Sequence, residues 1–279
     1  MRSPKSSSAT KPNAPSNPKL VVKKATKPAV KPGEKVATKP PKSAAKIPAA
    51  RASVRALPKV DGIITVGCAG FPVPATRYFK EFTFVEVQET HVAVQGMGTI
   101  RRWKREAAPG FTFSILAPKE IGQEGFRDGK VVESALKAMN EVGRELSVKV
   151  AVFVSPAEFT SSRPNKLAVK EFLSSVKKKF GRVIWEAPPS WDIEEAEALA
   201  TEAGAIASRD PLLAGLSKQP VAYYRLPGPA GHKSRYEDPA IERLAKLASE
   251  ATHTDATYVF TNVDMFADAK RFKKSMKIP

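Results

Sequence analysis

The chain has 279 residues, with 46 Lys and Arg against 28 Asp and Glu, and a formal net charge of +18 at pH 7. Its single Cys excludes an internal disulfide and fits a reducing compartment, which favours a cytoplasmic location. No run approaches the roughly 18 apolar residues of a membrane span, and no apolar segment follows the basic N-terminus, so neither a membrane partner nor a secretory signal is expected.

Residues 1–60 form the first predicted unit, a disordered basic tail. They hold 15 Lys and Arg against one acid, Glu34, together with 10 Pro and no aromatic residue. Proline at this density blocks helices, and so little apolar surface cannot offset the entropy lost on ordering. Spaced lysines on an extended chain can contact phosphates without reading bases, which predicts nonspecific nucleic-acid binding and association with the nucleoid. The alternative is a linker or solubilising segment that binds nothing specific.

Residues 61–279 form the second predicted unit, with 31 basic and 27 acidic residues. Short β-rich apolar runs predict eight strands, at 63–69, 82–88, 111–117, 148–155, 182–187, 205–210, 221–226 and 257–262. A period of 3.6 residues predicts helices at 130–146, 166–180, 192–203, 238–251 and 264–276, with short helices near 75–81 and 212–218. Eight strand–helix units predict an α/β fold, a (β/α)8 TIM-type barrel, with an open doubly wound sheet as the alternative.

Several ordered sequence blocks resemble the YecE-like family, also called domain of unknown function family 72. The similarity runs from Ile64 to about Met276, and the blocks lie at 65–70, 84–90, 100–103, 110–114, 117–119, 224–228, 236–238 and 258–262. The resemblance implies a TIM-type barrel but no reaction, and no motif in the chain indicates a cofactor. The chain departs from the family pattern at Gln88, Leu116, Pro188, Pro189 and Pro227. Most of these departures fall at strand ends, which puts any family activity in doubt for this chain.

The functional face of such a barrel is at the carboxyl ends of its strands. The polar residues expected there are Glu86, Gln88, Lys119, Glu186, Asp210, Arg225 and Asn262, with His232 and Tyr236 on the loop after the seventh strand. We expect Arg225 and Lys119 to clamp an anion, and Glu86 or Asp210 to serve as general base. His232, in a glycine-rich loop, is the third catalytic candidate, and Gln88, Glu186, Tyr236 and Asn262 are candidate ligand contacts.

Two other interpretations of these residues stay open. Arg225 could form an internal ion pair with Glu86 or Asp210 that stabilises the barrel mouth. A metal site built from Glu86, Glu186, Asp210 and His232 is conceivable, although no ligand spacing supports it. Cys68 is expected to be a buried small apolar residue, and Trp191 could line the mouth.

Two functions therefore follow from the sequence. The first is a barrel that binds or transforms a small anionic or phosphorylated ligand at its C-terminal mouth. The second is a noncatalytic module that the basic tail tethers to nucleic acid.

Overall fold

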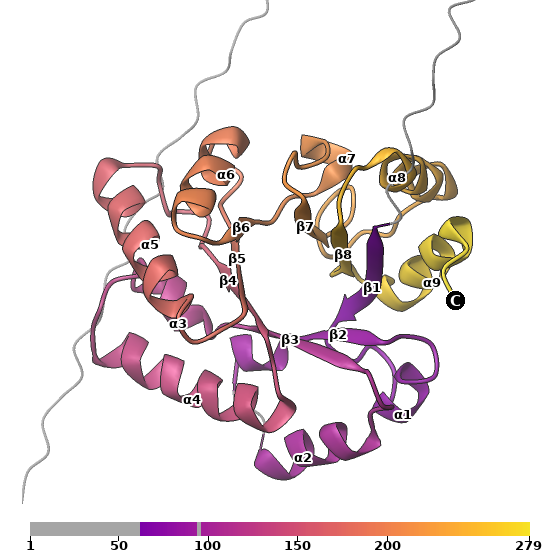
Figure 1. Ribbon diagram of the computed structural model, residues 1–279, viewed down its shortest axis with the longest axis horizontal. Coiled ribbons are helices and arrows are strands. Elements are labelled where there is room, and N and C mark those ends of the chain that lie inside the picture. The colour runs from indigo at the N-terminus through magenta and orange to yellow at the C-terminus, as the bar shows by residue number, and fades with distance from the viewer. Residues whose placement is uncertain (1–61, 94–95) are drawn as a thin grey trace, which may run out of the picture. The chain divides into compact units, whose positions relative to one another are not determined.

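A computed structural model describes residues 62–93 and 96–279 of the chain, so the predicted tail and the boundary at residue 60 lie outside it. Eight parallel strands form one sheet in the order β6-β5-β4-β3-β2-β1-β8-β7 (Figure 1). The strands are β1 (Ile63–Ala69), β2 (Phe84–Val87), β3 (Thr112–Leu116), β4 (Val150–Val154), β5 (Arg182–Glu186), β6 (Ile206–Ala207), β7 (Val221–Leu226) and β8 (Asp255–Phe260).

Helices alternate with these strands and surround the sheet (Figure 1). They are α1 (Ala75–Tyr78), α2 (Met97–Glu106), α3 (Lys119–Gln123), α4 (Lys130–Leu146), α5 (Arg163–Val176), α6 (Ile193–Glu202), α7 (Pro211–Ala214), α8 (Asp238–Glu250) and α9 (Met265–Met276), with a 3-10 turn, η1 (Glu89–His91), after β2. No helix within residues 62–93 and 96–279 is long and apolar enough to cross a membrane.

The sheet closes between its shortest strand, β6, and β7. The Ser208 amide donates to the Trp185 carbonyl of β5 (2.8 Å), and the next residue, Arg209, forms a single parallel bridge with Tyr224 of β7. The chain thus crosses from one edge of the sheet to the other. Arg209 Nη2 also donates to Glu197 Oε2 (2.7 Å), and both side chains are buried. The (β/α)8 TIM-type barrel predicted from the sequence is therefore confirmed.

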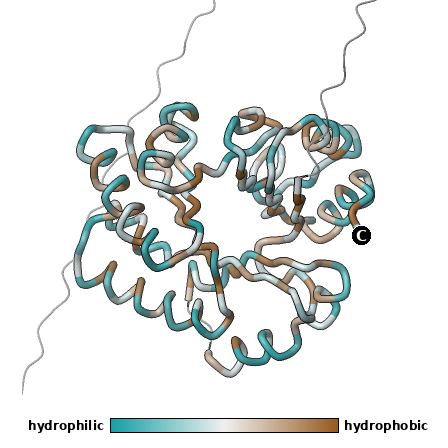
Figure 2. Tube along the Cα trace, viewed as in Figure 1, coloured by the Kyte–Doolittle hydropathy of each residue, from teal (hydrophilic) through white to brown (hydrophobic). Residues whose placement is uncertain are grey.

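Two apolar layers hold the barrel together. The larger one lies between strands and helices, where α4 buries Val132, Met139 and Val142 on the face that its periodicity predicted. The smaller one fills the barrel interior and includes Phe84, Leu116, Val152, Ile184 and Val259. Hydropathy follows the same plan, with apolar residues along the strands and polar residues outermost on the helices (Figure 2).

Most predicted elements are confirmed within a few residues, and the exceptions have physical causes. Helix α2 was not predicted, because it buries two side chains, Ile100 and Trp103, among Gly, Thr and charged residues, too few for a clear period. Helix α3 is also new. The predicted strand 205–210 is reduced to two residues by the crossing at Arg209. Trp191 does not line the mouth, because it is 6% exposed and its Nε1 donates to the Phe159 carbonyl (2.7 Å).

Candidate functional site

A layer of polar side chains from β2, β3, β5 and β7 lies among the apolar residues inside the barrel. Arg225, on β7, donates from Nε and Nη2 to the same oxygen of Glu86, Oε1, at 3.1 and 2.9 Å. Tyr223, two residues earlier on the same face, donates from its hydroxyl to Glu86 Oε2 (2.8 Å). Glu86 is 0% exposed and Arg225 is 8% exposed. A buried charge is stable when it is paired and hydrogen-bonded, and here both oxygens of Glu86 have partners.

Ser114 and Glu186 extend this layer in opposite directions. Ser114, which pairs with Glu86 across β2 and β3, lies 3.1 Å from the Tyr223 oxygen. Because the Tyr223 proton is directed at Glu86, Ser114 is the donor in that bond. On the other side, Arg225 Nη1 donates to Glu186 Oε2 at the end of β5. We call Ser114, Tyr223, Glu86, Arg225 and Glu186 the polar layer.

The ionisation of the polar layer follows from its burial and its charges. Burial would lower the pKa of the Arg225 guanidinium, but the carboxylates of Glu186 and Glu86 outweigh burial and raise it above the ordinary value. Burial, with a further contribution from the Glu86 charge, raises the pKa of the Tyr223 phenol well above its ordinary value. Arg225 therefore remains cationic and Tyr223 remains a neutral donor.

Glu186 is the exposed end of the polar layer. Its side chain is 33% exposed, whereas that of Glu86 is 0% exposed and that of Arg225 is 8% exposed. One carboxylate oxygen is held by Arg225, and within the described residues the other, Oε1, accepts no hydrogen bond. An ionised carboxylate held in one orientation at the end of a barrel strand can accept a hydrogen bond or a proton from a bound hydroxyl group.

Asp210 does not join the polar layer. Its Oδ1 accepts a hydrogen bond from the Leu212 amide (2.8 Å) and caps α7. Burial raises the pKa of the Asp210 carboxyl, and hydrogen bonds from the Leu212 amide and the Tyr236 hydroxyl oppose that rise. Tyr236 is itself buried, and its hydroxyl accepts from the Gly228 amide (2.8 Å). The predicted pairing of Asp210 with Arg225 is therefore not formed, and Asp210 and Tyr236 instead anchor the loop after β7.

Asn262 and His232 organise the neighbouring loop. Asn262 Nδ2 donates to Asp268 Oδ2 (2.8 Å) and to the Ser234 carbonyl (3.1 Å). The exposed His232 lies with Nδ1 2.8 Å from the Thr261 carbonyl, so Nδ1 carries the proton. Neither side chain hydrogen-bonds to Glu86 or Arg225 within the described part of the chain. One buried atom in this region, Asn262 Oδ1, has no hydrogen-bond partner among the described residues.

Lys119 and Gln88 also lie apart from Arg225. Lys119 is the exposed first residue of α3, whereas the Arg225 nitrogens all face carboxylates. Gln88 is half-buried directly after β2, packed near Gly70. The predicted clamp of Lys119 with Arg225 is therefore not assembled in this structure.

Two members of the polar layer were missing from the predicted site. Tyr223 shares the inward face with Arg225 by strand alternation, so the signal for it was present in the sequence. Ser114 carried no such signal, because a strand serine is informative only when its register against Glu86 is known. Within residues 62–93 and 96–279, no group of three or more His, Cys, Asp or Glu could hold a metal ion. The four residues of the alternative metal site therefore do not form such a group, and two of them, Glu86 and Glu186, are instead paired with Arg225.

Comparison with known proteins places the chain among barrel proteins. A family model described as "Protein of unknown function DUF72" matches residues 75–278. No curated protein matches the chain.

Among solved structures, a DUF72 family protein from Enterococcus faecalis is 13% identical with a TM-score of 0.64, covering 78% of this chain and 96% of the other. A DUF72 family protein from Thermotoga maritima is 19% identical with a TM-score of 0.60, and the match covers 77% of this chain and 100% of the other. A xylose isomerase domain containing protein from Salmonella typhimurium is 12% identical with a TM-score of 0.53, and the match covers 77% of this chain and 96% of the other. At these identities the structural similarities show the barrel fold alone.

Proposed function

The chain belongs to the DUF72 family, and from the charges of its polar layer we propose that the C-terminal mouth of the barrel binds a small, neutral, hydroxyl-bearing ligand at Glu186. The observation that carries this proposal is the contrast between the two carboxylates that Arg225 holds. Glu86 is buried with both oxygens bonded, whereas Glu186 is one-third exposed with one oxygen bonded. Glu186 is the member of the polar layer that a ligand can reach.

Arg225 makes Glu186 suitable for this role. The Arg225 guanidinium bonds both to Glu86, which is buried in the barrel interior, and to Glu186 at the mouth. Arg225 therefore holds the Glu186 carboxylate in place from the buried side. A group fixed before binding loses little conformational freedom when the ligand arrives. In this position Glu186 accepts a hydrogen bond from a ligand hydroxyl, and it can act as general base if that hydroxyl reacts.

The charge count favours a neutral ligand over an anionic one. Two carboxylates and one guanidinium give the polar layer a formal charge of −1, and Tyr223 stays neutral. A phosphate beside Glu186 would meet this negative charge, and the arginine that could offset it is already paired with two carboxylates. The small anionic or phosphorylated ligand expected from the sequence stays a prediction, as do the catalytic roles of Glu86, Asp210 and His232.

A panel of sugars tests the choice between the two ligand classes. The full chain is titrated with neutral pentoses and hexoses and with the corresponding sugar phosphates, followed by ligand-observed NMR. The basic residues 1–60 could themselves bind sugar phosphates. A ligand is therefore assigned to the barrel mouth only if the E186Q variant no longer binds it. We expect a neutral sugar to show Glu186-dependent saturation. Glu186-dependent binding of phosphorylated sugars alone would support the anionic ligand instead.

The second candidate function concerns residues 1–60, which lie outside the described residues. Their 15 basic residues against one acid favour binding to a polyanion such as DNA. The test compares DNA retention of the full chain with that of a chain lacking residues 1–60, across a salt series. Each phosphate that the segment neutralises should add about −0.9 to the slope of log affinity against log salt. Equal retention of both chains would exclude the segment as a DNA-binding element.

A further inference from the structure

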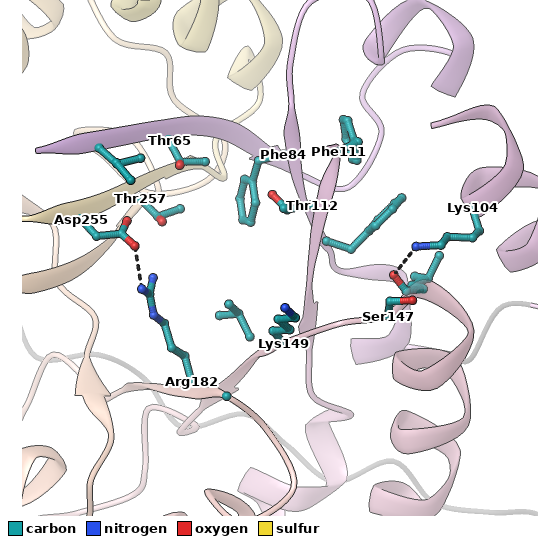
Figure 3. A pocket seen from close by; sticks show the side chains of 15 residues that line it. Thr65, Phe84, Lys104, Phe111, Thr112, Ser147, Lys149, Arg182, Asp255 and Thr257 are labelled. Carbon is teal, nitrogen blue, oxygen red and sulfur yellow. Dashed lines mark hydrogen bonds and ion pairs between the residues drawn. The ribbon is translucent and has the colours of Figure 1, made fainter. Parts of the chain in front are cut away.

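A cavity of about 490 Å³ lies at the opposite end of the barrel from Glu186. Its lining comes from the amino-terminal ends of β1, β2, β3, β4, β5 and β8, together with the ends of α2 and α4, as Figure 3 shows. Its volume falls within the range of small-molecule sites, roughly 300–1,000 Å³. This end of a TIM-type barrel ordinarily contributes stability rather than binding, so an open cavity here requires a physical explanation.

Small polar side chains create the space. Thr65 and Thr257 lie opposite each other in the pairing of β1 with β8, and Thr112 lies opposite Phe84 in the pairing of β2 with β3. Threonines take the place of the bulky residues that usually fill a barrel layer. The ring of Phe84 separates the cavity from the polar layer above, and Gly67 makes room for it, because a Cβ there would lie 2.6 Å from Phe84 Cδ1.

The charged groups of this cavity are predominantly cationic. Arg182 of β5 and Asp255 of β8 form an ion pair of 2.6 Å between strands that are far apart in the sheet order (Figure 3). Lys104 of α2 donates to the Leu146 carbonyl at the end of α4 (3.3 Å), where it offsets the negative end of that helix dipole. Lys149 is exposed, and within residues 62–93 and 96–279 no carboxylate lies within ion-pair distance of it.

Most of the remaining lining is apolar. It comprises Ile63, Phe84, Phe111, Phe113, Leu146 and Val150, together with Ser147 and Gly181. Ile63 is 66% exposed and so places apolar surface at the rim. A ligand that matches both parts of the lining needs an apolar body and one negative group.

We propose that the amino-terminal end of the barrel is a binding site for a small amphipathic anion, with Lys149 contacting the anionic group. The apolar body of the ligand packs against Phe84 and its neighbours, and Arg182, already fixed by Asp255, provides a second donor. The positive charge here contrasts with the negative charge of the polar layer, so the two ends of the barrel select different ligands. This site does not depend on the function proposed for Glu186.

The test uses naphthalene-2-sulfonate as the probe, titrated into the full chain by isothermal titration calorimetry. The K149E variant should weaken binding by about tenfold or more, and a matched variant of an exposed lysine on α9, K274E, should leave the Kd within about twofold of the wild type. Both variants retain residues 1–60, so any binding by that segment cancels. The neutral 2-naphthalenemethanol lacks the anionic group and inorganic sulfate lacks the apolar body, so each should bind more weakly than naphthalene-2-sulfonate.

A second variant tests the cavity itself. In T112W a large side chain at the cavity wall should remove probe binding while the melting temperature stays close to that of the wild type. Equal binding by wild type and K149E would overturn the proposal, as would a folded T112W chain that binds like the wild type. The absence of saturable binding to the wild type at millimolar probe would also overturn it.

Discussion

Arg225 donates two hydrogen bonds to one carboxylate oxygen of Glu86 and a third to Glu186, and so connects the closed interior of the barrel with its C-terminal mouth. The sequence left open whether Arg225 serves a ligand or an internal ion pair. In the structure its contacts are internal, and its effect on a ligand would be exerted through Glu186. Arg225 is therefore a positioning residue for Glu186.

Replacing Arg225 alone should strongly destabilise the folded protein. R225M leaves the Glu86 carboxylate buried without its cation and should lower the free energy of unfolding by about 3–5 kcal/mol. The double variant E86M/R225M removes both charges, so its loss should be smaller than the sum of the two single losses. Urea unfolding followed by circular dichroism measures each value.

The exposed pair of Lys170 and Glu202 provides the control for this cycle. Its atoms lie 2.7 Å apart, but the side chains are 44% and 62% exposed. The corresponding cycle should yield a coupling of about 1 kcal/mol or less. A Glu86–Arg225 coupling no larger than this would show that the buried pair does not stabilise the barrel.

Tyr223 supplies the second partner of Glu86. Y223F removes the hydroxyl that donates to Glu86 Oε2 and leaves that buried oxygen without a partner. The free energy of unfolding should therefore fall by about 1–3 kcal/mol. Tyr258 offers the matched control, because it is equally buried and its hydroxyl has no hydrogen-bond partner among the described residues. Y258F should change stability far less, and equal losses from the two variants would contradict the assigned hydrogen bond.

These residues also show how far the sequence could predict the site. The alternation of side chains along a strand was sufficient to predict that Glu86 and Arg225 face inward, and the eight strand–helix units were sufficient to predict the barrel. The partners of Asp210 and Asn262 could not be foreseen. Asp210 caps α7 through a local turn, and Asn262 bonds to Asp268 across the start of α9. Both contacts depend on loop geometry, which periodicity does not specify.

The position of Lys119 was also not specified by the sequence. Its place directly after a strand put it at the carboxyl end of the barrel, but α3 begins at Lys119 and the residue is exposed, so its role as a ligand contact stays a prediction. The cavity at the amino-terminal end was also not predicted, because it depends on the registers of Thr65, Thr112 and Thr257 in three strands. No single stretch of sequence shows that these threonines adjoin one space.

Asp210 gives the protein a predictable response to pH. Burial raises its pKa above the ordinary value of 3.8, so the folded state favours the protonated carboxyl. The contribution of Asp210 to stability is therefore fully present below the ordinary pKa and is lost as pH rises through the raised value.

The D210N variant tests this pH dependence because it keeps the oxygen that caps α7 and cannot ionise. Thermal unfolding across a pH series should show D210N gaining stability relative to the wild type as pH rises above about 4. A constant difference across the series would contradict the raised pKa. A growing advantage of the wild type with rising pH would indicate instead that the charged carboxylate is stabilised.

Glu186 carries the central claim, and one titration tests it directly. The full chain, its E186Q variant and the matched variant E171Q, which alters an exposed glutamate of α5, are titrated with the neutral sugar that binds the wild type best. E186Q should weaken binding by about tenfold or more while its melting temperature stays close to that of the wild type, and E171Q should bind the sugar as the wild type does. If E186Q binds the sugar as tightly as the wild type does, Glu186 is not the ligand contact and the proposed function is wrong.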